Sequence, residues 1–152
     1  MIEGLIFDFG RTLHEIESDQ LYPGAEELLS FLKNRGLKLA LVSRAQDPQK
    51  RQQDFARFNL QRFFQVFEIV PHEGTKTFDR ILAELGVKPE RCLVIGDRIK
   101  SEIVEANKAG LTTIWIRQGK FKDEVPENEE ETPDFIVHSL GELKTKLEEL
   151  IP

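Results

Sequence analysis

The stretch Leu5-Ile6-Phe7-Asp8-Phe9-Gly10-Arg11-Thr12-Leu13 decides the fold of this chain. An apolar run ends abruptly at the carboxylate of Asp8, and Gly10 and Thr12 then turn the chain away. The run predicts a short buried strand over residues 3–7 with Asp8 at its carboxyl end. Because ligands of open α/β sheets bind at the carboxyl ends of the strands, Asp8 is the first candidate site residue.

Three later segments repeat this design, each with an apolar run that ends at a polar residue: residues 39–43, 92–97 and 113–117. The first two end at Ser43 and Asp97. If the strands are parallel and adjacent, their carboxyl ends lie at one edge of the sheet. We therefore expect a site where Asp8, Ser43 and Asp97 meet.

Strand and helix patterns alternate along the whole chain. Strands are predicted over residues 3–7, 37–43, 66–70, 92–95, 111–116 and 134–137, and helices begin near residues 22, 47, 75, 99 and 140. Such alternation predicts an α/β, three-layer, Rossmann-like fold, with a mainly parallel sheet of five to six strands flanked by helices. No linker or repeat divides the chain, so one domain over residues 1–152 is expected.

Composition narrows the class of protein. The formal net charge of −6 argues against nucleic acid as the main partner. No apolar run approaches the roughly 20 residues of a membrane span, and the first residues lack a signal-peptide pattern, so we expect a cytoplasmic protein. The single cysteine, Cys92, lies within a predicted strand and is interpreted as a core residue.

Two kinds of charged segment are interpreted as solvent-facing. The basic stretches 49–51 and 120–122 are short and mixed with other residues, which favours exposed faces over a binding groove. Residues 118–132 are acidic and poor in apolar side chains, which favours a mobile surface loop over an active-site lid.

Four motifs resemble those of the haloacid dehalogenase (HAD) superfamily. Residues 6–13 are similar to its first motif, hydrophobic-Asp-x-Asp-x-Thr-Leu. Residues 41–43, 74–76 and 96–102 are similar to the second, third and fourth, in the same order. The intervals where the superfamily inserts cap domains are each filled by a predicted helix and strand. The resemblance therefore implies a single, capless HAD-like hydrolase domain, near the magnesium-dependent phosphatase branch.

The resemblance implies a catalytic role for three residues. Asp8 would be the nucleophile that takes the phosphoryl group as an aspartyl-phosphate. Ser43 would donate a hydrogen bond to a phosphate oxygen, and Lys76 would offset negative charge. Taken singly, a serine after a strand is more often a helix cap or turn residue, and a residue such as Lys76 is more often a surface lysine. The implied substrate is a small phosphorylated compound, and an open, capless site also allows a bulky one.

The resemblance also implies a Mg²⁺ site. The carboxylates of Asp8 and Asp97 and the backbone carbonyl of Gly10 would bind the ion. Glu102 would support this metal shell from a position where the superfamily more often has Asp. The three histidines, His14, His72 and His138, are scattered and are not expected to bind metal.

Gly10 is the main departure from the pattern, because the superfamily has a second Asp there as general acid and base. Losing that proton shuttle removes a contribution of roughly 10²- to 10⁴-fold in rate. We expect slow turnover, confined mainly to substrates with good leaving groups. Arg11, His14 or Glu15 could replace the acid only if one of them reaches the site.

Two other functions remain open from the sequence. A catalytically degenerate, HAD-like module that only binds metal or phosphate would also tolerate Gly10. A dehalogenase or phosphonatase would use the same nucleophile and also lack the second Asp, but such enzymes usually carry a cap. The natural substrate and the oligomeric state are not indicated.

Overall fold

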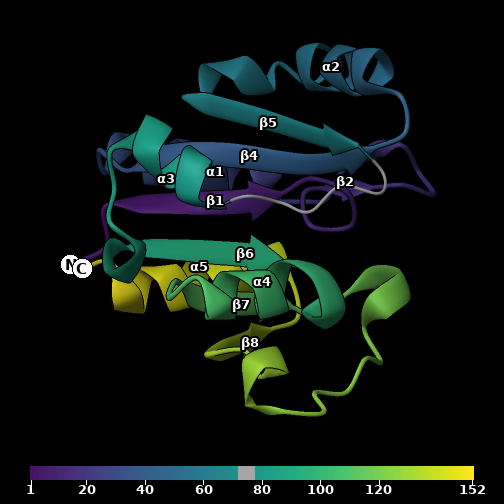
Figure 1. Cartoon of the computed structure of the whole chain (residues 1–152). Coiled ribbons are helices and arrows are strands. Elements are labelled where there is room, and N and C mark those ends of the chain that lie inside the picture. Colours follow the sequence, from purple (N-terminus) through teal and green to yellow (C-terminus); the bar gives the residue numbers. More distant parts are fainter. Residues whose placement is uncertain (72–77) are drawn as a thin grey trace.

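The computed structural model describes residues 1–71 and 78–152. Within these residues, six parallel strands form one sheet in the order β5-β4-β1-β6-β7-β8 (Figure 1). The strands are β1 (Gly4–Asp8), β4 (Lys38–Ala45), β5 (Val66–Pro71), β6 (Cys92–Gly96), β7 (Thr112–Ile116) and β8 (Phe135–Val137). Each predicted strand is present, with bounds that differ by one or two residues.

Helices cover both faces of this sheet. They form the two outer layers of the three-layer fold that the sequence predicts. They are α1 (Ala25–Asn34), α2 (Pro48–Arg57), α3 (Phe78–Leu85), α4 (Val104–Lys108) and α5 (Leu140–Leu150). Figure 1 shows α3 and α4 in front of the sheet and α1 and α5 behind it. The three-layer α/β fold class with a parallel sheet is therefore confirmed.

The central strand β1 explains how the layers are held together. Leu5 and Phe7 belong to the apolar cluster that includes α1 and α5, whereas Ile6 belongs to the cluster that includes α3 and α4. Successive side chains of a strand point to opposite faces, so a strand covered on both sides needs an unbroken apolar run. This requirement accounts for the apolar stretch that ends at Asp8.

Local signals place the starts of two helices as expected. The side chain of Asp47 accepts a hydrogen bond from the backbone N–H of Lys50, and Pro48 occupies the first turn of α2. The side chain of Ser139 caps α5 in the same way. These caps satisfy backbone donors that the first turn of a helix leaves unpaired.

Two segments differ from the prediction. Residues 14–21, expected to be an irregular connector, contain a short antiparallel hairpin of β2 (His14–Glu15) and β3 (Gln20–Leu21). The helix expected near residue 99 begins with a π-helical turn, Ile99–Ile103, and becomes α-helical only in α4. Periodicity cannot separate these two helix types over one turn.

The expectations for Cys92 and for the membrane can be compared with the structure. Cys92 is fully buried, and burial raises the pKa of its thiol to about 12, as suits a core residue. Among residues 1–71 and 78–152, the helices are all too short or too polar to cross a bilayer.

Candidate active site

Strand register brings Asp8, Ser43 and Asp97 to one edge of the sheet. Asp8 lies opposite Val42 of β4, so Ser43 follows one residue later. Phe7 lies opposite Ile95 of β6, so Asp97 follows just beyond that strand. From β1 the chain continues outward to β4 and β5 on one side, and then returns to add β6, β7 and β8 on the other side of β1. The carboxyl end of β1 therefore lies where the strand order reverses, which is where open α/β sheets bind ligands.

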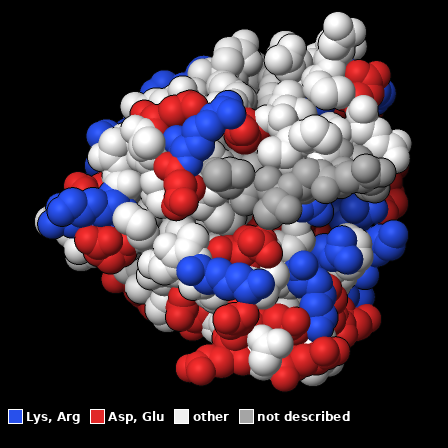
Figure 2. All heavy atoms as spheres, viewed as in Figure 1, with Lys and Arg blue, Asp and Glu red and all other residues white. Residues whose placement is uncertain are grey.

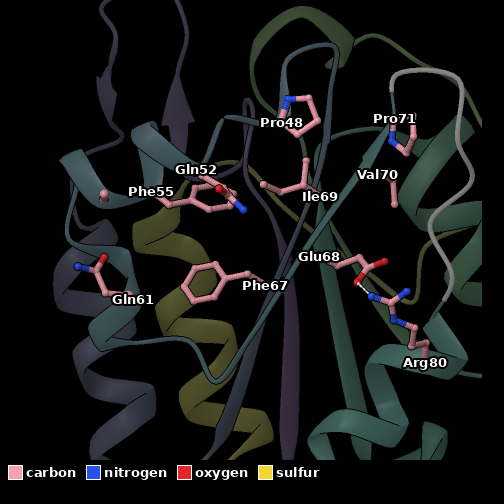
Figure 3. Close-up of a pocket in the computed structure, with 11 residues that line it drawn as sticks. Pro48, Gln52, Phe55, Gln61, Phe67, Glu68, Ile69, Val70, Pro71 and Arg80 are labelled. Atoms are coloured by element: carbon pink, nitrogen blue, oxygen red, sulfur yellow. Dashed lines mark hydrogen bonds and ion pairs between the residues drawn. The ribbon is translucent and has the colours of Figure 1, made fainter. Parts of the chain in front are cut away.

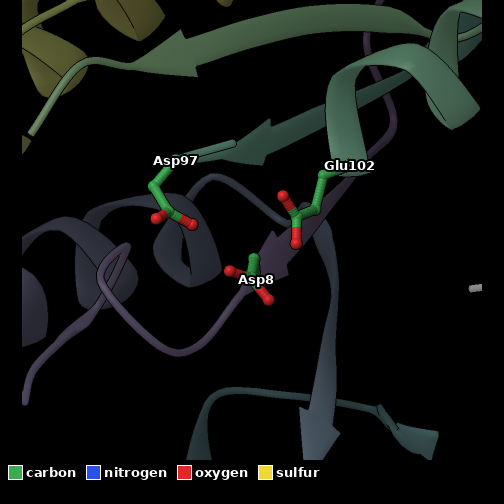
Figure 4. Close-up of side chains that lie close together, drawn as sticks. All are labelled: Asp8, Asp97 and Glu102. Carbon is green, nitrogen blue, oxygen red and sulfur yellow. The ribbon is translucent and has the colours of Figure 1, made fainter. Parts of the chain in front are cut away.

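Three carboxylates converge at this point. One carboxylate oxygen from each of Asp8, Asp97 and Glu102 lies within 4.8 Å of the others. Figure 4 shows Asp8 at the end of β1, Asp97 after β6, and Glu102 reaching in from the following helical turn. All three side chains are buried. The burial of three like charges is costly, and a divalent cation would offset it. Hard carboxylate oxygens are the ligands that Mg²⁺ prefers, so these residues fit that ion.

Glu102 owes its position to Gly96. A β-carbon at residue 96 would lie 2.8 Å from Glu102 Cβ and 3.0 Å from Glu102 Cγ. The π-helical turn that carries Glu102 can therefore approach the end of β6 only because residue 96 is glycine. Such turns are frequent at functional sites, where they redirect one side chain.

Asp97 is held through its backbone. The indole Nε1 of Trp115 donates a 2.9 Å hydrogen bond to the Asp97 carbonyl oxygen, and both groups are buried. Trp115 packs with Ile99 and Ile103, so the same cluster supports the turn that carries Glu102. Asp97 and Glu102, the two candidate metal ligands that follow β6, are thus positioned by the same apolar cluster of Ile99, Ile103 and Trp115.

The loop after β1 is a compact turn. Backbone N–H groups of Leu13 and His14 both donate to the Phe9 carbonyl, at 2.9 and 3.0 Å. Arg11 has a positive φ of 60° and donates its N–H to the His14 carbonyl at 2.8 Å. The backbone of Gly10, whose carbonyl is a candidate ligand, is therefore held between fixed neighbours.

Ser43 has a partner that the sequence did not indicate. Arg51 of α2 donates a hydrogen bond from Nη1 to Ser43 Oγ, and its guanidinium lies 5.1 Å from the centre of the Phe9 ring. Burial lowers the pKa of Arg51, whereas the charges of Asp54 and Asp8 raise it. Arg51 was expected to face solvent within a basic stretch, and that expectation was wrong because α2 turns this side chain inward.

An open cleft of about 330 Å³ surrounds Asp8. Its lining is rich in cations and comes from β1, β4, α2 and the segments that follow β1, β6 and β7: Asp8, Gly10, Arg11, Ile16, Ser43, Arg44, Arg51, Asp97, Arg98, Ser101, Lys120 and Phe121. Lys120 and Phe121 belong to the segment that was interpreted as a surface loop. The loop instead contributes a wall of the cleft, because its first turn folds back toward the loop after β1.

Of the residues considered as replacement acids, only Arg11 lines the cleft. His14 stacks on Phe9 with ring centres 4.9 Å apart and bonds to Asp19 at 2.9 Å. Glu15 accepts a hydrogen bond from Ser18. A guanidinium stays protonated at neutral pH, so Arg11 cannot shuttle a proton.

Two predicted residues lie outside the part of the chain that the structure describes. They are Lys76, the expected third-motif cation, and His72. His138, the remaining histidine, is exposed and pairs with Glu142 at 3.1 Å.

A larger cleft, of about 710 Å³, lies between α2 and the edge strand β5. Figure 3 shows its apolar wall, with Phe55, Phe67 and Ile69, and the ion pair between Glu68 and Arg80 at 2.9 Å. The carboxylate of Glu68 is paired with Arg80 here, and the described residues of the lining include no group of converging acids like that beside Asp8. The smaller cleft is therefore the candidate active site.

Known proteins resemble this chain in sequence and in fold. A family model described as HAD-hydrolase-like matches residues 73–143. The glyceraldehyde 3-phosphate phosphatase of Methanopyrus kandleri is 34% identical over 134 residues, covering 85% of this chain and 57% of that protein. The protein of the same name from Pyrococcus furiosus is 31% identical over 131 residues, covering 83% of this chain and 54% of that protein. The chain spans about half the length of these curated relatives.

A solved structure gives the same arrangement of elements. The magnesium-bound YfnB of Bacillus subtilis, assigned as a HAD-hydrolase, superposes with a TM-score of 0.78 at 17% identity. The match covers 96% of this chain and 98% of that one. This likeness shows the shared fold. The four motifs, the matching family model and the relatives at about one-third identity show that this chain belongs to the haloacid dehalogenase superfamily of hydrolases.

Proposed function

We propose that this chain is a Mg²⁺-dependent phosphohydrolase that acts on small phosphorylated compounds through an aspartyl-phosphate on Asp8. The observation that carries the proposal is the convergence of Asp8, Asp97 and Glu102 within 4.8 Å, beside the Ser43–Arg51 pair. Relatives named as phosphatases, at about one-third identity, support the same reaction class.

The metal would be held by the carboxylates of Asp8 and Asp97 and by the Gly10 carbonyl, with Glu102 supporting them. When bound, Mg²⁺ would offset the negative charge of the carboxylates and of the phosphoryl oxygens. The donor set is entirely oxygen and buried, which suits this ion.

The reaction would then divide between a few side chains. A carboxylate oxygen of Asp8 attacks phosphorus, the bond from phosphorus to the leaving oxygen breaks, and that oxygen departs with the electron pair. Ser43 and Arg51 donate hydrogen bonds to the phosphoryl oxygens and hold the group in line. Lys76 is proposed to supply a further positive charge. Water then attacks phosphorus, which frees phosphate and restores Asp8.

Gly10 sets the expected speed and selectivity. Without a carboxyl group at residue 10, the chain lacks the side chain that would usually protonate a leaving alkoxide and then remove a proton from the attacking water. Aryl and acyl phosphates need less help because their leaving groups are weaker bases. We therefore expect slow turnover of such substrates, with the phosphoenzyme accumulating.

A second candidate is a HAD-like module that binds metal and phosphate without turnover. Gly10 favours it, since the proton shuttle is the component that hydrolysis needs and binding does not. The two functions differ in one observable, which is whether a covalent bond to Asp8 forms and breaks.

The test is pre-steady-state hydrolysis of p-nitrophenyl phosphate with magnesium chloride. We expect a burst of nitrophenolate equal to the enzyme concentration and then a slow phase, both lost with a chelator and in Asp8→Asn. The matched control is Asp79→Asn, an exposed carboxylate on α3, which should behave like the natural chain. Mg²⁺-dependent phosphate binding without any burst would favour the binding module. Equal rates for alkyl and aryl phosphates, without a burst, would contradict the role given to Gly10.

A further inference from the structure

Three cations surround one aromatic ring at the mouth of the cleft. The guanidinium of Arg98 lies 4.4 Å from the centre of the Phe121 ring, that of Arg11 lies 5.6 Å away, and Lys120 Nζ lies 5.5 Å away. Arg11 follows β1, Arg98 follows β6, and Lys120 and Phe121 follow β7. All four residues line the same cleft as Asp8.

Hydrogen bonds fix this wall in place. Gln118 Nε2 donates to the carbonyl oxygens of Arg11 at 2.9 Å and Thr12 at 3.2 Å, joining the loops after β7 and β1. Glu124 accepts a 2.9 Å hydrogen bond from the backbone N–H of Ile99, which joins the same loop to the π-helical turn. The cations are thus presented by a preformed surface, which lowers the entropic cost of binding a ligand there.

The charges of this wall are only partly matched. Arg98 has an acidic neighbour, because its Nε lies 3.8 Å from Glu124 Oε2. Arg11 and Lys120 make no ion pair with any residue in 1–71 or 78–152. Within those residues, the buried Nε of Arg11 also lacks a hydrogen-bond acceptor. A buried donor without an acceptor is uncommon in folded proteins, and a bound water or a ligand group would satisfy it.

The excess of cations stands out against a chain whose formal net charge is −6. Figure 2 shows basic side chains gathered at the right-hand edge, on the side to which the strand arrows of Figure 1 point, and acidic ones along the bottom. Cations concentrated around a cleft attract anionic substrates and orient them.

We propose that Arg11 and Lys120 bind a second anionic group of the substrate, a carboxylate or another phosphate, while the phosphoryl group lies at Asp8. The inference rests on the proposed function and narrows its substrate class to small, doubly anionic phosphorylated compounds. The cleft volume of about 330 Å³ is in the lower range of small-molecule sites. Phe121 serves here to hold the cations in position, because the three cations already lie around its ring.

The test compares two phosphonates that cannot be hydrolysed, 3-phosphonopropionate and propylphosphonate, by calorimetry in magnesium chloride. They share a phosphonate and a three-carbon chain, and differ in one carboxylate. We expect 3-phosphonopropionate to bind about tenfold more tightly or better, as charge-assisted hydrogen bonds to a partly buried cation allow. The ratio of the two affinities, 3-phosphonopropionate over propylphosphonate, should fall toward one in Lys120→Gln. It should fall further in the Arg11→Gln/Lys120→Gln double variant.

Two controls keep a folding effect separate from a binding effect. Lys122→Gln removes an exposed lysine of the same loop that does not line the cleft, and it should keep the full preference. Lys120→Arg keeps the charge and should restore most of the preference. Propylphosphonate affinity should fall much less than 3-phosphonopropionate affinity in Lys120→Gln, because propylphosphonate has no second anion for Lys120 to bind.

The outcomes separate this inference from the function on which it rests. Equal affinity for the two phosphonates, or a preference that survives both substitutions, would overturn the second anion site and leave the phosphohydrolase proposal intact. Failure of both phosphonates to bind would overturn the proposed function and the second site together.

Discussion

Gly96 lies so close to Glu102 that a β-carbon at residue 96 would stand 2.8 Å from the β-carbon of the glutamate. This contact joins the end of β6 to the π-helical turn and fixes where the third carboxylate can reach. The requirement is steric and not conformational, because the backbone of Gly96 is ordinary strand. It explains why a Gly-Asp pair ends this strand.

Gly96→Ala should therefore displace Glu102. We expect magnesium affinity to fall by about 10- to 100-fold, as when other supporting groups of metal sites are lost. The free energy of unfolding should fall by about 1–3 kcal/mol, the usual cost of overpacking. Calorimetric titration with magnesium and thermal unfolding would measure the two effects. Gly141→Ala is the control, because its nearest neighbour to a new β-carbon, Ser139 Oγ, lies 3.7 Å away. Unchanged magnesium affinity in Gly96→Ala would remove Glu102 from the metal shell.

Gly10→Asp should restore the missing general acid. Among residues 1–71 and 78–152, a β-carbon at residue 10 would meet only Ile16 Cδ1, at 3.9 Å, and the variant should fold normally. We expect turnover of an alkyl phosphate to rise by roughly 10²- to 10⁴-fold, the contribution of a positioned proton shuttle. Gly10→Ala should fold equally well without this gain. A stable Gly10→Asp protein with no increase for alkyl phosphates would mean that residue 10 does not face the leaving group.

Arg51→Gln should weaken phosphate binding. The substitution removes the cation that donates to Ser43 Oγ. We expect kcat/KM for p-nitrophenyl phosphate to fall by about 10- to 100-fold, corresponding to a charge-assisted hydrogen bond of roughly 1.5–3 kcal/mol. Lys50→Gln, its exposed neighbour on α2, should have little effect. Equal kinetics for the two variants would show that Arg51 only supports the fold.

Cys92 offers a test of the core through pH. Burial raises the pKa of its thiol from 9.0 to about 12, so the folded protein keeps the thiol protonated where the unfolded chain releases its proton. Its contribution to stability is therefore complete below pH 9 and declines as the pH rises from 9 toward 12. Relative to Cys92→Ala, the natural chain should lose about 1.4 kcal/mol for each pH unit above 9. Denaturant titrations at pH 8 and pH 10 would show it, and a constant difference between the two proteins would contradict it.

Much of the fold could be predicted because its signals are local. The apolar runs that become β1, β4 and β6 end at Asp8, near Ser43 and at Gly96, and parallel pairing then brings these ends together. Sheet order decides which strand ends are neighbours, and the alternation of strands and helices restricts that order strongly.

The parts of the site that sequence reasoning missed depend on contacts between distant segments. Arg51 faces Ser43 because of how α2 packs on Phe9, and charge pattern alone makes such a residue look exposed. Lys120 and Phe121 reach the cleft because Gln118 bonds to the loop after β1, more than one hundred residues earlier. The available signal was Phe121, an aromatic residue between two lysines. That pattern does not indicate whether the side chains face the cleft or the solvent.

The nucleophilic role of Asp8 is tested most directly by trapping the phosphoryl group. The protein would be mixed with acetyl phosphate and magnesium chloride, quenched in acid, and examined by mass spectrometry of the intact chain and its peptides. We expect the mass of one phosphoryl group, located on Asp8 and absent from Asp8→Asn. Complete hydrolysis of acetyl phosphate by the enzyme with no covalent phosphate at any point of the time course, or with the group on another residue, would contradict this role.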